Sequence, residues 1–324
     1  MSPVSGAPPA HPPEWPPELS PGVVTEVAPG VRRIVAPNPG IMTGPGTNTY
    51  LVGGDRLAVV DPGPDDDAHL AALLDAAGDR IGWIMVTHSH IDHSPLAARL
   101  HDLTGAPVVG FGPPPAPRPG GAAGGLDPHD GTFAPDRRLL DGDRVDLGDC
   151  ALDAVYTPGH ASNHLCFELA GTGLLLSGDH VMSGSTVVIA PPDGDMAVYL
   201  ESLEKVRGRA PGRIAPGHGA MIDDPASVLD SYLRHRRERE AQVLAALGAG
   251  GGGSRSIEAL VEAVYTDVPD ALHPVARYSV WAHLRKLAAE GRAASPDRED
   301  IAAPWRLIPG RPRGAGRAGG ESGE

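Results

Sequence analysis

The sequence predicts an α/β fold followed by a small C-terminal domain. Short apolar strands alternate with helical stretches up to residue 247, potential metal ligands follow several of these strands, and a Gly-rich run at 248–254 precedes the last segment. Strands that alternate with helices are typical of α/β architectures. The chain has 324 residues, of which 41% are hydrophobic, so it can form one large domain and a small one.

The N-terminal part of the large domain, which we place at 21–247, begins as a meander of strands. Residues 1–20 are Pro-rich, and we expect them to be a disordered lead-in. Short β-branched and apolar runs between Gly, Pro and Asn turns predict strands at 31–36, 47–52, 57–61 and 81–86. The spacing of Leu70, Leu73 and Leu74 predicts a helix before the last of these strands. A further helix is expected through Leu103, capped by Ser94 and started by Pro95.

The second part repeats this pattern. Residues 112–125 are almost entirely Pro, Gly and Ala, which predicts a surface insertion. Strands are expected at 144–147, 152–157, 164–169 and 173–177, and helices at 195–207 and 226–247. Beyond the linker at 248–254, helices at 256–265 and 275–290 and a hairpin-like segment at 291–307 form a domain over 255–308. We expect the tail at 309–324 to be disordered.

The net charge is −14 and is unevenly distributed. Residues 1–250 hold 17 Lys and Arg against 31 Asp and Glu, whereas residues 251–324 hold 10 of each sign. A strongly acidic domain repels nucleic acid unless basic side chains are clustered or metal ions supply positive charge. The charge therefore argues against a nucleic-acid substrate for the large domain.

The sequence also indicates a compartment. The N-terminus has neither a secretory signal nor an Arg-rich transit peptide, and no apolar run approaches the length of a membrane span. Cys150 and Cys166 lie in apolar strand-like segments, so we interpret them as buried free thiols. A cytoplasmic protein without membrane association is expected.

One stretch is typical of a metal site. Thr87-His88-Ser89-His90-Ile91-Asp92-His93 follows the strand at 81–86, and three further candidate ligands occupy later turns, His160, Asp179 and His218. Zinc is usually held by imidazole nitrogen and carboxylate oxygen. Seven ligands are too many for one tetrahedral ion but suit two ions about 3.5–4 Å apart.

These motifs carry a resemblance to a known family. His88-x-His90-x-Asp92-His93 with Gly159-His160, Gly178-Asp179 and Gly217-His218 resembles the metallo-β-lactamase superfamily of metallo-hydrolases over residues 23–245. The resemblance implies a four-layer αββα sandwich in which His88, His90 and His160 hold one zinc ion, Asp92, His93 and His218 hold another, and Asp179 bridges them. It also implies that Asp61 supports the ligands from outside.

The implied mechanism is hydrolysis by a metal-bound hydroxide. A coordinated water has a pKa of about 7, so a nucleophile exists at neutral pH. Asp92 is expected to orient it and accept its proton, in addition to binding metal. Two Zn²⁺ are the expected cofactors, and iron and manganese remain open because imidazole suits several metals.

Other polar residues are weaker candidates. Asn48, Tyr50 and His164 are candidates for the border of the site or the substrate pocket, although the same residues are common in strands and turns. We interpret His180 as a neighbour of a ligand and not as a ligand. Three histidines outside any motif are expected at the surface, His101, His129 and His235.

The branch of the superfamily is indicated by further segments. Thr47-Asn-Thr-Tyr50, Ser94-Pro95, Tyr265-Thr-Asp-Val-Pro-Asp-Ala-Leu-His273 and Ser279-Val-Trp-Ala-His-Leu284 resemble the β-lactamase-like protein 2 branch. This resemblance implies a C-terminal winged helix and an endoribonuclease that cleaves single-stranded RNA. Nearby branches imply the main alternative, hydrolysis of acyl-carrier, CoA or glutathione thioesters.

Two other classes stay open, an iron-dependent oxidoreductase and a non-enzymatic regulator that binds nucleic acid. The winged helix is alternatively a packing surface or the interface of a homodimer.

Overall fold

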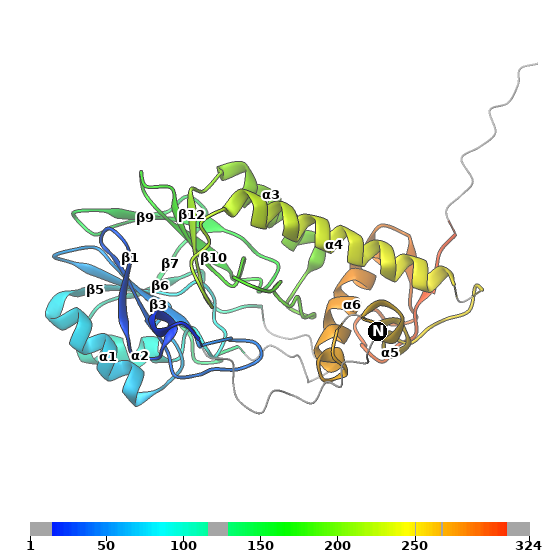
Figure 1. The fold of residues 1–324 in the computed structure, drawn as a ribbon, viewed down its shortest axis with the longest axis horizontal. Coiled ribbons are helices and arrows are strands. Elements are labelled where there is room, and N and C mark those ends of the chain that lie inside the picture. Colours follow the sequence, from blue (N-terminus) through cyan, green and yellow to red (C-terminus); the bar gives the residue numbers. More distant parts are fainter. Residues whose placement is uncertain (1–14, 116–128, 250, 267, 310–324) are drawn as a thin grey trace, which may run out of the picture. The chain divides into compact units, whose positions relative to one another are not determined.

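The computed structural model describes residues 15–115, 129–249, 251–266 and 268–309. The chain divides into two compact units, residues 1–236 and 237–324. In the first unit two β-sheets pack against each other, and helices lie on the outer face of each sheet (Figure 1). The predicted α/β fold class is confirmed.

The first sheet joins an antiparallel and a parallel half. Its seven strands lie in the order β1 to β7. They are β1 (Val24–Ala28), β2 (Val31–Val35), β3 (Asn48–Val52), β4 (Leu57–Val60), β5 (Ile81–Met85), β6 (Val108–Gly110) and β7 (Arg137–Arg138). Neighbours from β1 to β4 are antiparallel, and neighbours from β4 to β7 are parallel. Parallel neighbours need crossovers; α1 (Asp67–Ala77) and η2 (Gly78–Arg80) connect β4 to β5, and α2 (Leu96–Thr104) connects β5 to β6.

The second sheet has five strands in the order β12-β11-β10-β9-β8. They are β8 (Arg144–Asp146), β9 (Ala151–Tyr156), β10 (Leu165–Leu169), β11 (Leu174–Gly178) and β12 (Arg213–Pro216). The strands from β8 to β11 are antiparallel neighbours, whereas β12 is parallel to β11 after a crossover through α3 (Met196–Arg209).

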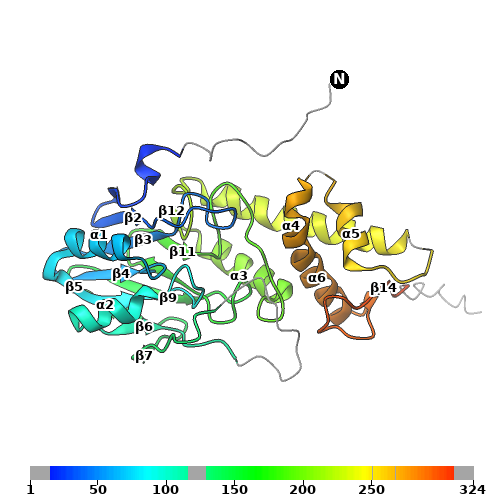
Figure 2. The ribbon, with the colours of Figure 1, turned by 90° about the horizontal axis from the view of Figure 1, so that it is seen from below.

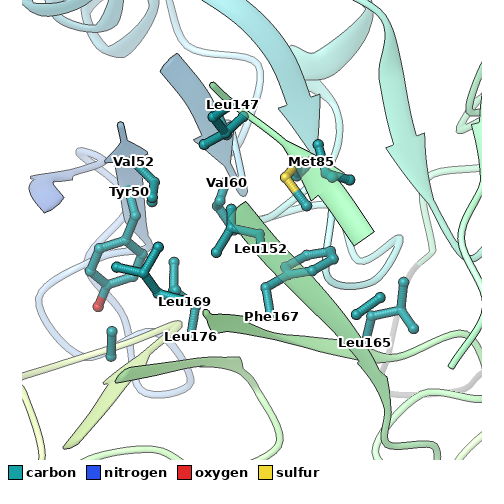
Figure 3. Packing of buried hydrophobic residues seen from close by; sticks show 14 of the residues in the cluster. Tyr50, Val52, Val60, Met85, Leu147, Leu152, Leu165, Phe167, Leu169 and Leu176 are labelled. Carbon is teal, nitrogen blue, oxygen red and sulfur yellow. The ribbon is translucent and has the colours of Figure 1, made fainter. Parts of the chain in front are cut away.

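The first sheet is buried on both faces. In β3, Tyr50 and Val52 belong to the apolar cluster between the sheets, whereas Leu51 belongs to the cluster under α1 and α2. This alternation follows from the two-residue period of a strand. Figure 3 shows Tyr50 and Val52 in the same cluster as Phe167 of the second sheet. The ring of Phe167 is fully buried, which contributes about 1.5–3 kcal/mol to stability.

Helices cover the outer faces of both sheets. Figure 2 shows α1 and α2 beside β5, on the far side of the first sheet from α3. Asp195 starts α3 by accepting hydrogen bonds from two backbone N–H groups of its first turn. The hydroxyl of Tyr199 donates to the carbonyl of His180 at 2.9 Å, and that of Ser202 to Pro158 at 2.7 Å. This helix therefore holds two of the loops that follow strands of the second sheet.

The second unit is mainly helical. It contains the end of α4 (Pro225–Gly248), then α5 (Ile257–Val264), η3 (Asp270–Leu272), α6 (His273–Ala289) and the antiparallel pair β13 (Ala293–Ala294) and β14 (Arg306–Leu307). Its core combines Leu247 of α4, Leu260 of α5, Leu284 of α6 and the fully buried Trp305. None of the helices in the described parts of the chain is long and apolar enough to cross a membrane.

Several expectations about order and boundaries differ from the structure. Residues 15–20 are ordered, because η1 (Pro17–Leu19) buries Leu19 and the carbonyl of Glu18 accepts a hydrogen bond from Arg33. The units divide inside α4, before the predicted linker at 248–254, because the last turns of α4 contribute to the core of the second unit. The lead-in before residue 15, most of the insertion at 112–125 and the tail after residue 309 lie outside the described residues.

Smaller local expectations also differ. Strands β1, β6, β7 and β12 were not predicted; β1 is half exposed, and the other three are short segments without a readable apolar alternation. Ser94 does not cap α2 with its side chain. Its hydroxyl donates to the carboxylate of Asp130 at 3.1 Å instead.

Candidate metal centre

The loops after four strands bring the seven predicted ligands together. Residues 88–93 follow β5, and the other three ligands follow β9, β11 and β12. In the part of the chain that the structure describes, their ligand atoms form three groups within 4.8 Å, namely His88, His90 and His160, then Asp92, His93 and His218, and finally His88, His93 and Asp179. We call the first of these sets the triple-histidine group and the second the Asp92 group.

The triple-histidine group is compact and buried. Nε2 of His88 lies 2.8 Å from Nδ1 of His90, and Nε2 of His160 lies 3.1 Å from the same atom. Each side chain is at most 6% exposed. Three ring nitrogens that converge in this way fit a cation that accepts their lone pairs.

The Asp92 group lies beside it. The carboxylate of Asp92 is 3.6 Å from Nε2 of His93 and 3.3 Å from Nε2 of His218. Asp179 borders both groups, because its oxygens lie 3.5 Å from His93, 3.3 Å from His218 and 3.9 Å from His160. A carboxylate in this place can be shared by two neighbouring ions.

Hydrogen bonds outside the cluster set the orientation of the imidazoles. Nδ1 of His160 donates to the carbonyl of Val188 at 2.9 Å, and Nδ1 of His218 donates to the carbonyl of Gly46 at 3.2 Å. A carbonyl only accepts, so in the neutral form of both rings the proton is on Nδ1 and the lone pair of Nε2 faces the cluster. That is the tautomer that can bind a metal through Nε2.

Burial and charge give the cluster its electrostatic character. Burial and the neighbouring imidazoles lower the pKa of His88 well below its usual value. Burial acts to lower the pKa of His218 as well, but Asp179 and Asp92 outweigh it and raise this pKa to about 10. Burial acts to raise the pKa of Asp179, yet His218 and His93 hold it well below its usual value. The cluster therefore combines the neutral imidazole of His88, a protonated His218 and ionised carboxylates, and a divalent metal ion would take the place of the proton on His218.

Comparisons with known proteins identify the family. Residues 42–218 match the sequence profile of the metallo-β-lactamase superfamily. The β-lactamase-like protein 2 homologue of Drosophila melanogaster is 33% identical over 83% of this chain and 91% of its own length. This chain belongs to the metallo-β-lactamase superfamily.

Other comparisons extend the assignment to both units. Residues 256–305 match the winged helix domain associated with β-lactamase domains. The lactamase-like protein adaB of Aspergillus niger is 30% identical over 83% of this chain and 85% of its own length. A metallo-β-lactamase family protein of Thermus thermophilus has the same fold, with a TM-score of 0.69 at 20% identity, covering 87% of this chain and all of the other. The predicted superfamily fold with a C-terminal winged helix is thus confirmed.

The glycines of the superfamily motifs are needed for space. A Cβ atom at Gly217 would lie 2.4 Å from the carboxylate of Asp179 and 2.9 Å from the ring of His93. Gly178 has φ +47°, and its Cβ would lie 2.7 Å from the hydroxyl of Thr87. Only a glycine lets these loops approach the ligands so closely.

The weaker candidates lie behind the cluster. Asn48 Nδ2 and the hydroxyl of Tyr50 both donate to the carbonyl of Pro216, at 2.9 and 2.8 Å, and so hold the loop of His218. Nε2 of His164 accepts from the backbone N–H of Asp179 at 3.2 Å. All three side chains are at most 2% exposed. They position loops and do not line an open pocket.

The remaining histidines fall into two classes. His180 is fully buried, with its ring 5.3 Å from that of Tyr199, and does not join the ligand groups. His101 and His235 are partly exposed. The expectation of a surface position is wrong for His129, whose side chain is only 18% exposed and whose ring centroid lies 4.7 Å from that of His90. No motif surrounds His129, so nothing in the local sequence indicated this place.

Proposed function

We propose that this chain is a hydrolase that binds two zinc ions, one at the triple-histidine group and one at the Asp92 group, with Asp179 shared between them. The observation that carries the proposal is the position of Asp179, within 3.9 Å of imidazoles from both groups. When bound, the ions would supply Lewis acidity, polarise the scissile bond and lower the pKa of a water molecule to about 7.

Within this cluster, Asp92 is suited to proton transfer. Its side chain is 24% exposed, more than Asp179 at 10% or His93 at 0%. Burial acts to raise the pKa of Asp92, but His93 and His218 lower it further than burial raises it. At neutral pH its carboxylate can therefore accept a hydrogen bond from the attacking water, orient it and take its proton.

Exposed apolar side chains near the cluster favour an acyl substrate. Ile91, which stands between two ligands, is 49% exposed. Ile41 and Met42 are 72% and 40% exposed, on the loop that ends at Gly46, whose carbonyl holds His218. Large apolar side chains left open to water beside a polar site indicate a binding surface for apolar groups. We propose a thioester of an apolar acyl group as the substrate.

Cleavage of single-stranded RNA is the second candidate, and the winged helix match supports it. Three of its basic side chains, however, are already paired with carboxylates at 2.7 Å, namely Arg277 with Glu258, Arg285 with Glu299 and Lys286 with Glu240. Phosphates would have to replace these carboxylates, and phosphate contacts supply most of the affinity for nucleic acid.

The test combines metal content with turnover. Protein purified without added metal is expected to hold about two zinc per chain, and to hydrolyse long-chain acyl thioesters but not single-stranded RNA. His90→Ala should abolish the activity. RNA cleavage without thioester turnover would move the function to the second candidate. Iron with no hydrolysis of either substrate would overturn the reaction class.

A matched pair of variants tests the substrate class. Ile41→Ser with Met42→Ser should raise KM for long acyl chains by about 10-fold, as expected for about 1.4 kcal/mol of lost apolar contact, and leave short chains unchanged. Leu103→Ser, at a residue 61% exposed on α2, is the control. Equal effects on long and short chains would contradict the acyl contact.

A further inference from the structure

His129 is joined to the loop between two ligands by its backbone and its side chain. The backbone N–H of Asp130 donates to the carbonyl of Ser89 at 2.6 Å, and His90 pairs with His129 as an antiparallel bridge. Nδ1 of His129 lies 2.8 Å from the hydroxyl oxygen of Ser89. The ring is thus fixed against the triple-histidine group without contributing an atom to it.

The side chain of His129 is one link in a continuous hydrogen-bond chain. Nδ2 of Asn163 donates to the hydroxyl of Ser89 at 2.9 Å, and Nε2 of His129 lies 3.2 Å from the carboxylate of Asp193. The same carboxylate oxygen accepts from the backbone N–H of Ser162 at 2.8 Å. The bonds therefore run without a break from Asn163 through Ser89, His129 and Asp193 to Ser162.

The direction of these bonds follows from their chemistry. Burial acts to raise the pKa of Asp193, but its bonds to His129 and Ser162 hold it below its usual value, so Asp193 is a carboxylate that only accepts. In the neutral ring of His129, Nε2 then carries the proton and Nδ1 accepts from the hydroxyl of Ser89. That hydroxyl accepts in turn from Asn163. Every donor in this series of hydrogen bonds then has an acceptor, so the directions of the bonds are consistent with one another.

This hydrogen-bond chain connects the two loops that supply the triple-histidine group. Ser89 stands between ligands His88 and His90, whereas Ser162 and Asn163 follow ligand His160 within three residues. His90 and His160 are 70 residues apart in sequence. The bonds through His129 and Asp193 therefore close a ring that fixes one ligand loop against the other.

We propose that His129 is a positioning residue for the metal ion of the triple-histidine group, with Asp193 as the residue that orients it. This inference rests on the proposed two-metal function. Partners that orient metal ligands typically account for about 10–100-fold in metal affinity. The hydrogen-bond chain holds Ser89, between ligands His88 and His90, and the loop of His160, and it makes no bond to the side chains of Asp92, His93 or His218, so its loss should weaken the triple-histidine group selectively.

The experiment compares His129→Ala in two backgrounds. His218→Ala leaves only the triple-histidine group complete, and His160→Ala leaves only the Asp92 group complete. Zinc affinity is measured by competition with a chromophoric chelator. His129→Ala should weaken binding by about 10–100-fold in the His218→Ala background and leave it unchanged in the His160→Ala background. His129→Asn, whose amide oxygen can replace Nδ1 as acceptor, should restore part of the affinity.

The control is His101→Ala, which removes a partly exposed histidine that is not part of the hydrogen-bond chain. It should change the zinc affinity in neither background. If His129→Ala does not fold without metal, Asp193→Asn removes the charge at constant volume and should give the same selective loss. Equal weakening in both backgrounds, or unchanged affinity in the His218→Ala background, would overturn the inference. Absence of zinc binding by the unmodified chain would instead refute the proposed function itself.

Discussion

The carboxylate of Asp61 accepts a hydrogen bond from Nδ1 of His93 at 2.9 Å, across 32 residues of sequence. It also accepts from the backbone N–H and the hydroxyl of Thr87, both at 2.8 Å. Asp61 has φ 52°, in the left-handed region that non-glycine residues rarely adopt. Three bonds thus hold a strained residue at the end of β4 and join both ends of the ligand loop after β5.

Asp61→Asn should weaken the Asp92 group. Three donors face the carboxylate, and an amide has only one oxygen to accept them. The affinity for the metal ion bound with His93 is expected to fall by about 10–100-fold, measured by competition with a chelator in the His160→Ala background. Asp65→Asn, at an exposed aspartate paired with Arg99, should have no effect. Equal affinities for the two variants would show that the bond to His93 is dispensable.

Gly217→Ala should prevent metal binding while the chain stays folded. The new methyl group would lie 2.4 Å from the carboxylate of Asp179 and would displace it from both ligand groups. Zinc content is expected to fall below one ion per chain, with an unchanged circular dichroism spectrum. The matched control is Gly208→Ala in α3, where a Cβ meets nothing within 4 Å. That variant should be neutral, or more stable by about 0.5–1 kcal/mol. Full zinc occupancy in Gly217→Ala would contradict the predicted clash.

Removal of metal should destabilise one unit and not the other. All seven ligands belong to the unit that ends at Arg236. A bound ion stabilises the folded state by about 4 kcal/mol when its free concentration is about 1,000 times Kd. A chelator should therefore lower the unfolding temperature of this unit. In a Trp15→Phe, Trp83→Phe variant, fluorescence reports only Trp281 and Trp305 of the second unit, and this transition should not move. A matching shift of both transitions would mean that the units unfold together.

Glu240 should make the stability of the second unit depend on pH. Burial acts to raise its pKa, but His283 and Lys286 lower it from 4.5 to about 2. Because the folded pKa is the lower one, the stabilisation is complete above pH 4.5 and is lost as pH falls toward about 2. Glu240→Gln should cost about 1–2 kcal/mol at pH 7, after allowance for solvent screening.

Urea unfolding of the Trp15→Phe, Trp83→Phe variant at several pH values, with and without Glu240→Gln, measures this effect. The difference in unfolding free energy between the variants with and without Glu240→Gln should decrease steadily below pH 4.5. Glu262→Gln, at an exposed position of α5, should give no difference at any pH. A constant cost of Glu240→Gln down to pH 3 would assign its effect to packing and not to charge.

The sequence predicted elements well where local pattern decides them. The strand at 81–86 and the helix at 226–247 correspond to β5 and α4, because apolar periodicity over five or more residues reflects one buried face or a fully buried strand. It failed for β7, which has two exposed arginines and exists only because β6 offers a free edge. It also failed for His129, whose place beside His90 depends on a backbone bridge between the two residues.

The sequence by itself indicated seven candidate ligands and the family, because each candidate stands in a turn after a strand and is recognised from its immediate neighbours. The resemblance also implied how these candidates divide into two groups with Asp179 between them, and the structure brings the same groups together. Only the tertiary structure showed which nitrogen of His160 and His218 faces the cluster, and that His129 connects two ligand loops. The physical reason is that these relationships join loops far apart in the chain, which approach only when two sheets pack face to face and bury the residues between them.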